Sequence, residues 1–343
     1  MTIVEGTILR GHEFEPIEGR VVVGDDGRIE AVEEGKARSD DIVIPAFVNA
    51  HTHVGDSIAK DVGEGMTLEE LVAPPDGLKH RLLRAADREE QVTAIRRSLA
   101  FAAAGGTAAV LDFREGGVEG VERLHEAAES VPVKALALGR ETVAAMEAGE
   151  GFGASSTNDG EFASERTATR EAGKLFGIHA GEADSSDLNG GLDLDPDFLV
   201  HVVHPEPVHL ERIADSEVPV VVCPRSNLVT NVGVPPVRDL LDRTTVALGT
   251  DNVMLNSPNM FREMAITAKL TDASAREVLG MATRAGAEIA GLNWGVIEPG
   301  REARLVVLDG DSDNLAGTKN PVRAVVRRAG VADVSETIGP DQC

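Results

Sequence analysis

The middle of the chain alternates short apolar runs with stretches of amphipathic helical periodicity. Eight apolar runs are candidate strands, at residues 43–53, 107–113, 133–139, 149–156, 174–180, 197–203, 218–224 and 245–251. Strands that alternate with helices form a parallel sheet, and eight such units predict a closed (β/α)₈ TIM barrel in the α/β class. An open, doubly wound sheet is the alternative, but no GxGxxG phosphate-binding fingerprint follows the first run.

Both ends of the chain are β-rich instead. Near the N-terminus, TIVEGTILRG and GRVVVGDDGRIEAVEEG alternate apolar and polar residues, with DDG as a hairpin turn signal. Near the C-terminus, ARLVVLDGD and PVRAVVRRAGVADV have the same extended pattern. We therefore expect residues 1–46 and 297–343 to form the two parts of one small β-sandwich domain, and residues 47–296 to form the barrel.

The charge of the chain is strongly acidic. Fifty-eight Asp and Glu residues face 33 Lys and Arg residues, which gives a formal net charge of −25. Because phosphate groups are bound through Lys and Arg, this balance argues against nucleic-acid and membrane partners. The acids are spread along the chain rather than gathered in a tail, and this distribution predicts an acidic, solvated surface of the kind that halophilic proteins have. An ordinary acidic enzyme is the alternative.

Other features of the sequence predict a cytoplasmic protein. No apolar run approaches the ~20 residues of a membrane span. The N-terminal residues lack the basic and apolar regions of a secretory signal. The two cysteines, Cys223 and Cys343, lie far apart and give no disulfide framework.

Polar residues follow several of the predicted strands. His51 and His53 are two residues apart, so an extended strand points both imidazoles to the same face, where they suit a divalent ion such as Zn²⁺. Later runs close in the same way, with His179 at the end of the fifth, His201 and His204 around the end of the sixth, and Asp251 at the end of the eighth.

Barrel closure brings these residues together. It places the first and eighth strands side by side, so Asp251 is expected beside His51 and His53. Taken alone, Asp251 serves equally well as a helix cap and each histidine as an ordinary polar residue, but the joint pattern predicts a metal site. His201 and His204 face opposite sides of an extended strand, so only one of them is expected to enter the site.

A family resemblance adds to this interpretation. The phrases PAFVNAHTHVGDS, GIHAGE, LVHVVH, CPRSN and LGTDN occur in this order. They resemble the metal-dependent amidohydrolase superfamily, and in particular its mononuclear branch of cytosine-, guanine- and adenosine-type deaminases and triazine hydrolases. The resemblance extends from about residue 43 to residue 309. It implies that one divalent ion is held by His51, His53, His179 and Asp251.

The resemblance also implies a set of catalytic roles. Glu182, three residues after His179, corresponds to the proton shuttle, and His201 to the residue that polarises water or the group under attack. Asp251 would accept a proton from that water while it contacts the metal. Zn²⁺ suits these nitrogen and oxygen ligands best, with Fe²⁺ as the alternative. Residues 149–159 contain no lysine, although the binuclear branch keeps one there, and this supports a single ion.

Candidate substrate-binding residues follow other strands. Arg140, Ser155, Ser156, Asn158 and Ser226 also occupy such positions, but we expect the substrate to be bound by Arg114, Glu141, His204, Arg225 and Asn227. Arg114 and Arg225 are the preferred pair, since a guanidinium group at a barrel mouth binds a carboxylate, phosphate or ring carbonyl through two hydrogen bonds. Aromatic side chains, which would stack on a ring, are scarce.

We therefore predict a hydrolase that acts on non-peptide C–N bonds. The first hypothesis is hydrolytic deamination of an amino-substituted heterocycle, such as a nucleobase or nucleoside. The second is hydrolysis of a ring amide or cyclic amidine, as imidazolone-type or triazine-type hydrolases perform. The third is a barrel without catalysis, which Glu182 disfavours because such a protein needs no proton shuttle. The expected partner is a small heterocyclic substrate, and the resemblance is compatible with a homodimer.

Overall fold

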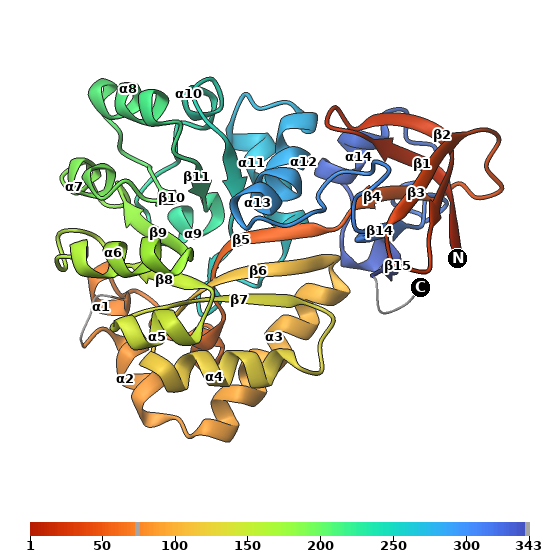
Figure 1. Cartoon of the computed structure of the whole chain (residues 1–343). Helices are drawn as coiled ribbons and strands as arrows, with labels where there is room; N and C mark the ends of the chain where they lie inside the picture. Colours follow the sequence, from red (N-terminus) through yellow and green to blue (C-terminus); the bar gives the residue numbers. More distant parts are fainter. Residues whose placement is uncertain (73–75, 340–343) are drawn as a thin grey trace. The chain divides into compact units, whose positions relative to one another are not determined.

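The computed structural model describes residues 1–72 and 76–339, and Figure 1 shows its elements coloured along the chain. Contacts divide the chain into two compact units. One consists of Met1–Val48, Ala102–Ala108 and Asn259–Cys343, and the other of Asn49–Phe101 and Ala109–Pro258. The expected β domain of residues 1–46 and 297–343 falls in the first unit, which also includes residues 259–296. Cys343 lies outside the described residues.

All eight predicted apolar runs form strands of one parallel sheet. In spatial order they are β12 (Val246–Leu248), β11 (Val220–Val222), β10 (Phe198–His201), β9 (Leu175–Ala180), β8 (Gly151–Ala154), β7 (Lys134–Gly139), β6 (Thr107–Arg114), β5 (Phe47–His53) and β13 (Asp251–Asn252). Most of their residues are buried, as a sheet covered on both faces requires.

The sheet closes on itself through the eighth run. This run forms both β12 and β13, which Gly249 and Thr250 separate. β12 pairs with β11, and β13 pairs with β5, so the last strand joins the seventh to the first. The prediction of a (β/α)₈ barrel is confirmed.

Helices connect the strands along the chain. They are η1 (Val54–Ala59), α1 (Leu68–Val72), α2 (Leu78–Ala85), α3 (Arg88–Ala104), α4 (Gly117–Ala128), α5 (Val143–Ala148), α6 (Ala163–Ala172), α7 (Leu188–Asp193), α8 (Pro207–Ser216), α9 (Pro224–Val229), α10 (Val237–Leu241), α11 (Met260–Leu270), α12 (Ala275–Ala282) and α13 (Arg284–Ile289). Within the described part of the chain, no helix has the length and apolar character needed to cross a bilayer.

The two ends of the chain form a second sheet. Its order is β15 (Val334–Ile338), β14 (Leu305–Leu308), β4 (Ile42–Pro45), β1 (Thr2–Arg10), β2 (Glu15–Val23) and β3 (Ile29–Glu34). The run predicted at 43–53 is thus shared, because β4 belongs to this sheet and β5 to the barrel. The inward side chains form a core that includes Val21, Val43 and Leu305. The prediction of a small β domain built from both termini is confirmed.

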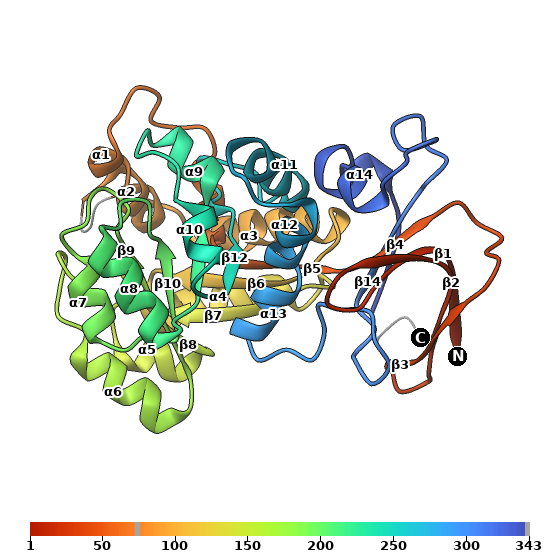
Figure 2. The same cartoon turned by 90° about the horizontal axis from the view of Figure 1, so that it is seen from above.

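One element of this domain differs from the prediction. The stretch PVRAVVRR forms the helix α14 (Pro321–Arg327), not an extended segment. Val322, Val325 and Val326 are buried and lie at helical spacing, so they form the apolar face of the helix. The same apolar residues were also compatible with an extended strand. Asn320 caps the helix by accepting a hydrogen bond from the Arg323 backbone amide at 3.0 Å. α14 packs against α11 and α12 (Figure 2).

This cap gives a test of the corrected element. Replacing Asn320→Ala removes the acceptor for an amide at the start of the helix and should lower the free energy of unfolding by about 1 kcal/mol. Asn320→Asp keeps the acceptor and should unfold close to the wild-type temperature. Thermal unfolding followed by circular dichroism measures both variants. An alanine variant as stable as the wild type would show that the cap contributes nothing.

Candidate metal centre

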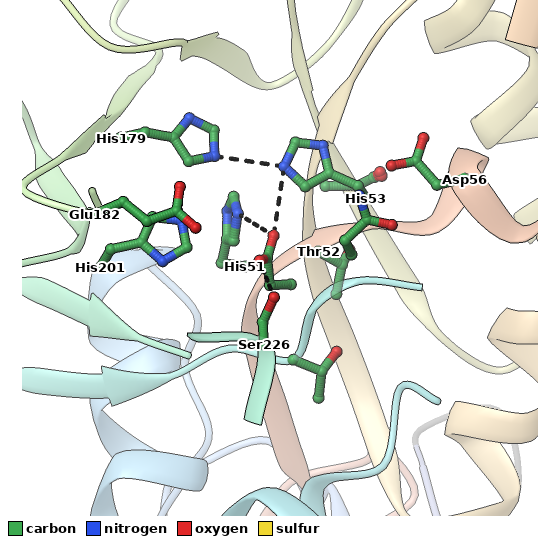
Figure 3. Close-up of polar contacts among 12 residues, drawn as sticks. His51, Thr52, His53, Asp56, His179, Glu182, His201 and Ser226 are labelled. Carbon is green, nitrogen blue, oxygen red and sulfur yellow. Dashed lines mark hydrogen bonds and ion pairs between the residues drawn. The ribbon is translucent and has the colours of Figure 1, made fainter. Parts of the chain in front are cut away.

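Barrel strand ends bring five predicted residues to one point. His51 and His53 come from β5, His179 from β9, His201 from β10 and Asp251 from β13. The ligand atoms of His51, His53 and His179 all lie within 4.8 Å of one another, as do those of His51, His201 and Asp251. Figure 3 shows the three imidazoles of His51, His53 and His179 turned toward a common space.

The distances across this space are short. His51 Nε2 lies 3.2 Å from Asp251 Oδ1, and His53 Nε2 lies 3.7 Å from the same oxygen. His53 Nε2 and His179 Nε2 are 3.4 Å apart. Burial lowers the pKa of His53 to about 3, and it also lowers those of His51 and His179. The three rings are therefore neutral at pH 7, the form in which an imidazole binds a metal.

Hydrogen bonds at the opposite ring nitrogens fix two of these tautomers. His179 Nδ1 lies 2.8 Å from the Ala154 carbonyl oxygen and donates to it. His53 Nδ1 donates to Glu115 Oε1 at 3.1 Å. Each ring then presents a lone pair at Nε2, so two lone pairs face each other across 3.4 Å.

His51 completes the case for a cation. Both of its ring nitrogens are buried, and apart from the Asp251 oxygen 3.2 Å from Nε2 neither has a partner among the described residues. Buried polar atoms without partners are rare and costly, and a cation would satisfy the converging nitrogens together with the Asp251 carboxylate. Three imidazoles and one carboxylate thus fit a divalent ion such as Zn²⁺.

His201, and not His204, lies in the site. Asn227 Nδ2 donates to His201 Nδ1 at 3.1 Å, which leaves the proton of the neutral ring on Nε2. That nitrogen is 3.5 Å from Glu182 Oε2. His204 is exposed, and its Nε2 lies 2.7 Å from the Val232 carbonyl oxygen. His201 therefore presents an N–H group to the centre.

Backbone strain gathers at the same place. His201 has a φ of 79°, Val202 of 48° and Asp251 of 58°, all in the left-handed region that disfavours residues other than glycine. Each such residue costs about 1–3 kcal/mol and persists only where its surroundings hold it. Two of the three are centre residues, so the fold maintains a costly conformation there.

Glu182 stands beside this cluster. It follows β9, and its side chain points toward His201 in Figure 3. Burial raises the pKa of Glu182 above its ordinary value, because an ionised carboxylate is poorly solvated there. A carboxyl group with a raised pKa holds its proton to higher pH and can exchange it with a reacting group.

A cavity of about 290 Å³ opens onto the centre. Four centre residues, His53, His179, His201 and Asp251, line it together with Glu69, Val72, Lys79, Arg140, Ser155, Ser156, Asn158, Asp159, Glu182, Ala183, Asp184, Asp187, Ser226, Thr230, Asn252 and Leu255. Neither Phe nor Trp is among the lining residues that the structure describes. The wall is polar and carries two cationic side chains, Lys79 and Arg140.

None of the five residues expected to bind substrate lines this cavity. Arg114 is buried, with Nη2 3.3 Å from Glu115 Oε2. Glu141 is exposed and accepts a hydrogen bond from a backbone amide at Gly116. The Arg225 guanidinium donates to a backbone carbonyl at Ser257, and Asn227 and His204 make the contacts given above. These side chains thus direct their polar groups toward other protein groups and not into the cavity.

Arg140 takes the place that Arg114 was expected to have. Both arginines lie at the end of a strand, Arg114 as the last residue of β6 and Arg140 directly after β7. Arg114 also faces Asp112, since Asp112 Oδ1 lies 3.9 Å from Arg114 Nη1, and burial raises the pKa of Asp112 to about 7. The carboxyl groups of Asp112 and Glu115 hold the Arg114 guanidinium against Gly55, whereas Arg140 lines the cavity.

Sequence reasoning missed Lys79 altogether. It lies on α2, outside the strand ends, and no motif marked it. The lysine is buried, and its Nζ is 2.8 Å from Glu115 Oε1 and 3.0 Å from Asp56 Oδ2. The sequence did carry one indication. The chain has only seven lysines, so a lysine at any position is unusual for this protein and could have been considered as a functional residue.

Comparisons with known sequences agree with this geometry. A family model described as "Amidohydrolase family" matches residues 42–184 and 163–335. A Methanothermobacter thermautotrophicus protein with the name "Putative aminohydrolase" is 36% identical over 360 residues, covering 90% of this chain and 91% of that protein. A 5-methylthioadenosine/S-adenosylhomocysteine deaminase of Haloquadratum walsbyi is 37% identical over 160 residues, covering 43% of this chain and 36% of that protein.

Solved structures share the fold. Atrazine chlorohydrolase TrzN from Arthrobacter aurescens TC1, complexed with zinc, aligns with a TM-score of 0.86 and 20% identity, covering 100% of this chain and 94% of that one. A zinc-bound adenosine deaminase from Xanthomonas campestris aligns with a TM-score of 0.74 and 18% identity, covering 99% and 92%. The family-model match over most of the chain, and a relative aligned along nine-tenths of its length, show that this protein belongs to the amidohydrolase family.

Proposed function

We propose that this protein deaminates an amino-substituted heterocycle by hydrolysis, with one divalent ion held by His51, His53, His179 and Asp251. The observation that carries the proposal is the pair of Nε2 lone pairs that face each other across 3.4 Å, with Asp251 on one side and the cavity beyond. The relatives named as deaminases support the reaction type.

The residues around the ion divide the chemistry between them. When bound, a divalent ion lowers the pKa of a water molecule toward ~7 and makes it nucleophilic at neutral pH. Asp251 would help to hold the ion and serve as a proton acceptor, since Ser226 Oγ donates to its Oδ2 at 2.5 Å and leaves Oδ1 facing the histidines. Glu182, with its raised pKa, carries a proton to the departing nitrogen, because ammonia leaves only after protonation.

His201 orients the group under attack. Its Nε2–H faces the centre because Asn227 donates to Nδ1. A donor at this place stabilises negative charge that develops on the substrate during attack, or holds the water by one of its lone pairs.

We propose Zn²⁺ as the ion and a single ion per site. Neutral imidazoles and one carboxylate are ligands that Zn²⁺ prefers, and Fe²⁺ is the second choice. The two candidate ligand triads share His51, so they describe one position rather than two separate ones. β8 contributes no lysine that could bridge a second ion.

We also propose that the protein works at high internal salt, in the cytoplasm, without nucleic-acid or membrane partners. A net charge of −25 supports this setting, because salt screens the repulsion among surface carboxylates.

A first prediction concerns the ligands. His51→Ala should lose the ion, because it removes the buried imidazole that belongs to both triads. Elemental analysis of the purified protein should give one ion per wild-type chain and much less in the variant. His204→Ala, which changes an exposed imidazole outside the cavity, is the matched control and should keep the ion. Full metal content in His51→Ala would contradict the ligand assignment.

A second prediction concerns proton transfer. Glu182→Gln should retain the ion but reduce turnover by at least about 100-fold, since an amide cannot carry the proton. Ammonia release from a panel of amino-substituted heterocycles measures it. Turnover at the wild-type rate in this variant would remove Glu182 from its role. A wild-type product that retains its nitrogen would favour the second hypothesis, hydrolysis of a ring amide or cyclic amidine.

A third prediction concerns salt. Raising KCl from about 0.1 M to about 1 M shortens the screening length from ~10 Å to ~3 Å, so the unfolding temperature should rise. Differential scanning calorimetry follows it, and sucrose at matched osmolarity separates screening of charge from solute exclusion. An unfolding temperature that stays constant or falls with KCl would argue for an ordinary acidic enzyme.

A further inference from the structure

The carboxylate of Glu115 accepts hydrogen bonds from four side chains, of which His53, Lys79 and Arg114 are buried and Arg140 is partly buried. Glu115 directly follows β6, and its side chain is 5% exposed. Oε1 accepts from His53 Nδ1 at 3.1 Å, from Lys79 Nζ at 2.8 Å and from Arg140 Nη1 at 2.8 Å. Oε2 accepts from Arg114 Nη2 at 3.3 Å. A single side chain thus connects a ligand of the centre with three cations.

We propose that Glu115 and Lys79 form a positioning pair that fixes the ring orientation and tautomer of His53 and thereby sets how tightly the centre holds its ion. The proposal rests on the metal site given under the proposed function. Neither residue lies among the proposed ligands, and both act through His53.

The hydrogen bond defines what the pair does to the ring. An ionised carboxylate has no proton to donate, so the Nδ1 proton must lie on His53, and Nε2 is left with its lone pair. The bond also stops rotation of the imidazole about its Cβ–Cγ bond. Carboxylates that hold ligand histidines in this way raise the basicity of the ligand and fix its direction.

Lys79 keeps this carboxylate charged and in place. Burial strongly disfavours an ionised carboxylate unless it is paired with positive charge, and the Lys79 ammonium group supplies such a charge. Lys79 bonds Glu115 and, at 3.0 Å, Asp56 Oδ2, so it ties the carboxylate to η1, the turn that directly follows His53. Asp56 is fully buried, and no other ion pair of its carboxylate is found among the described residues.

The charge of Glu115 has a second effect on the centre. Lys79, Arg140 and Arg114 place three positive charges beside a site that must hold a divalent cation. Glu115 contacts all three, so neutralising it would leave these cations to repel the ion. Orientation and charge therefore act in the same direction on affinity.

His53 differs in this respect from the other ligands. His179 donates from Nδ1 to the backbone carbonyl at Ala154, which no substitution removes. His51 has no Nδ1 partner among the described residues. The bond from His53 to Glu115 is the one that a side-chain variant can test.

Arg114 supports the pair through its contacts with Gly55 and Glu115. The Arg114 guanidinium lies against the backbone of Gly55, where an added Cβ would sit 1.6 Å from Arg114 Nη1. Glycine at this position, two residues after His53, lets the buried guanidinium approach the chain closely enough to reach Glu115.

The test measures metal affinity in the full-length, zinc-loaded protein by competition with a chelator. Glu115→Gln keeps the shape of the side chain but removes its charge, and Lys79→Met removes the ammonium group with little change in volume. Glu115→Gln should weaken zinc binding by about 10- to 100-fold. Lys79→Met should weaken it by less, because loss of the ammonium group also removes a charge that repels the ion.

Two matched controls separate this effect from general loss of charge. Glu150→Gln removes a carboxylate that pairs with His125 at 3.4 Å, away from the centre, and Lys60→Met removes an exposed ammonium group. Both should bind zinc as the wild type does. Weakened binding in the controls to the same extent would overturn the proposal.

Nitrogen NMR of the zinc-loaded wild type gives a readout that needs no variant. The ¹⁵N shifts should show His53 protonated at Nδ1 and bound to zinc through Nε2, and Glu115→Gln should shift the Nδ1 signal. Zinc on Nδ1 would overturn the proposal. Wild-type affinity in both variants would overturn it too while leaving the proposed function intact, whereas a wild type without zinc would defeat the proposed function itself.

Discussion

The closure of the barrel between β5 and β13 is the constraint on which the site depends. Asp251 pairs with Thr52 across this seam, and the pairing brings a carboxylate from the end of the barrel to two histidines from its beginning. Gly249 makes the close approach of the two strands feasible, since an added Cβ would lie 2.7 Å from the Cβ of His51 and 2.9 Å from its carbonyl oxygen. The fold thus achieves its ligand set by joining the first and last strands.

The electrostatics of the centre follow from burial. Burial keeps the histidine rings neutral and able to bind a cation, and it raises the pKa of Glu182, so this group keeps its proton to higher pH than a free carboxyl group. One physical effect therefore prepares the ligands and the proton carrier together. The strained backbone at His201 and Asp251 shows that the surrounding structure holds the arrangement against a local cost.

The barrel and the ends of its strands were predictable from the sequence. Apolar runs with a regular repeat fix the strands, and polar residues that end them must meet at one rim, so His51, His179 and Asp251 could be placed together. The single run at 43–53 concealed two strands because both sheets demand apolar residues there.

The lining of the cavity was not predictable in the same way. Arg114 and Arg140 both lie at strand ends, and only the buried carboxyl groups near Arg114 decide which of them reaches the cavity. Lys79 lies on a helix and Glu115 follows a strand, and the two are far apart in the sequence. The periodicity of apolar residues does not indicate that they pair. In α14, the apolar residues have a spacing that is compatible with both a helix and a strand. The packing of the buried valines, such as Val325, favours the helix.

X-ray absorption at the zinc edge of the loaded protein tests the central claim most directly. One zinc ion held by three imidazoles and a carboxylate should give nitrogen and oxygen neighbours at about 2.0–2.2 Å, with the outer-ring scattering of histidine and no heavier neighbour. A sulfur neighbour at about 2.3 Å would contradict this ligand set. A second metal at about 3.5–4 Å would contradict the single ion.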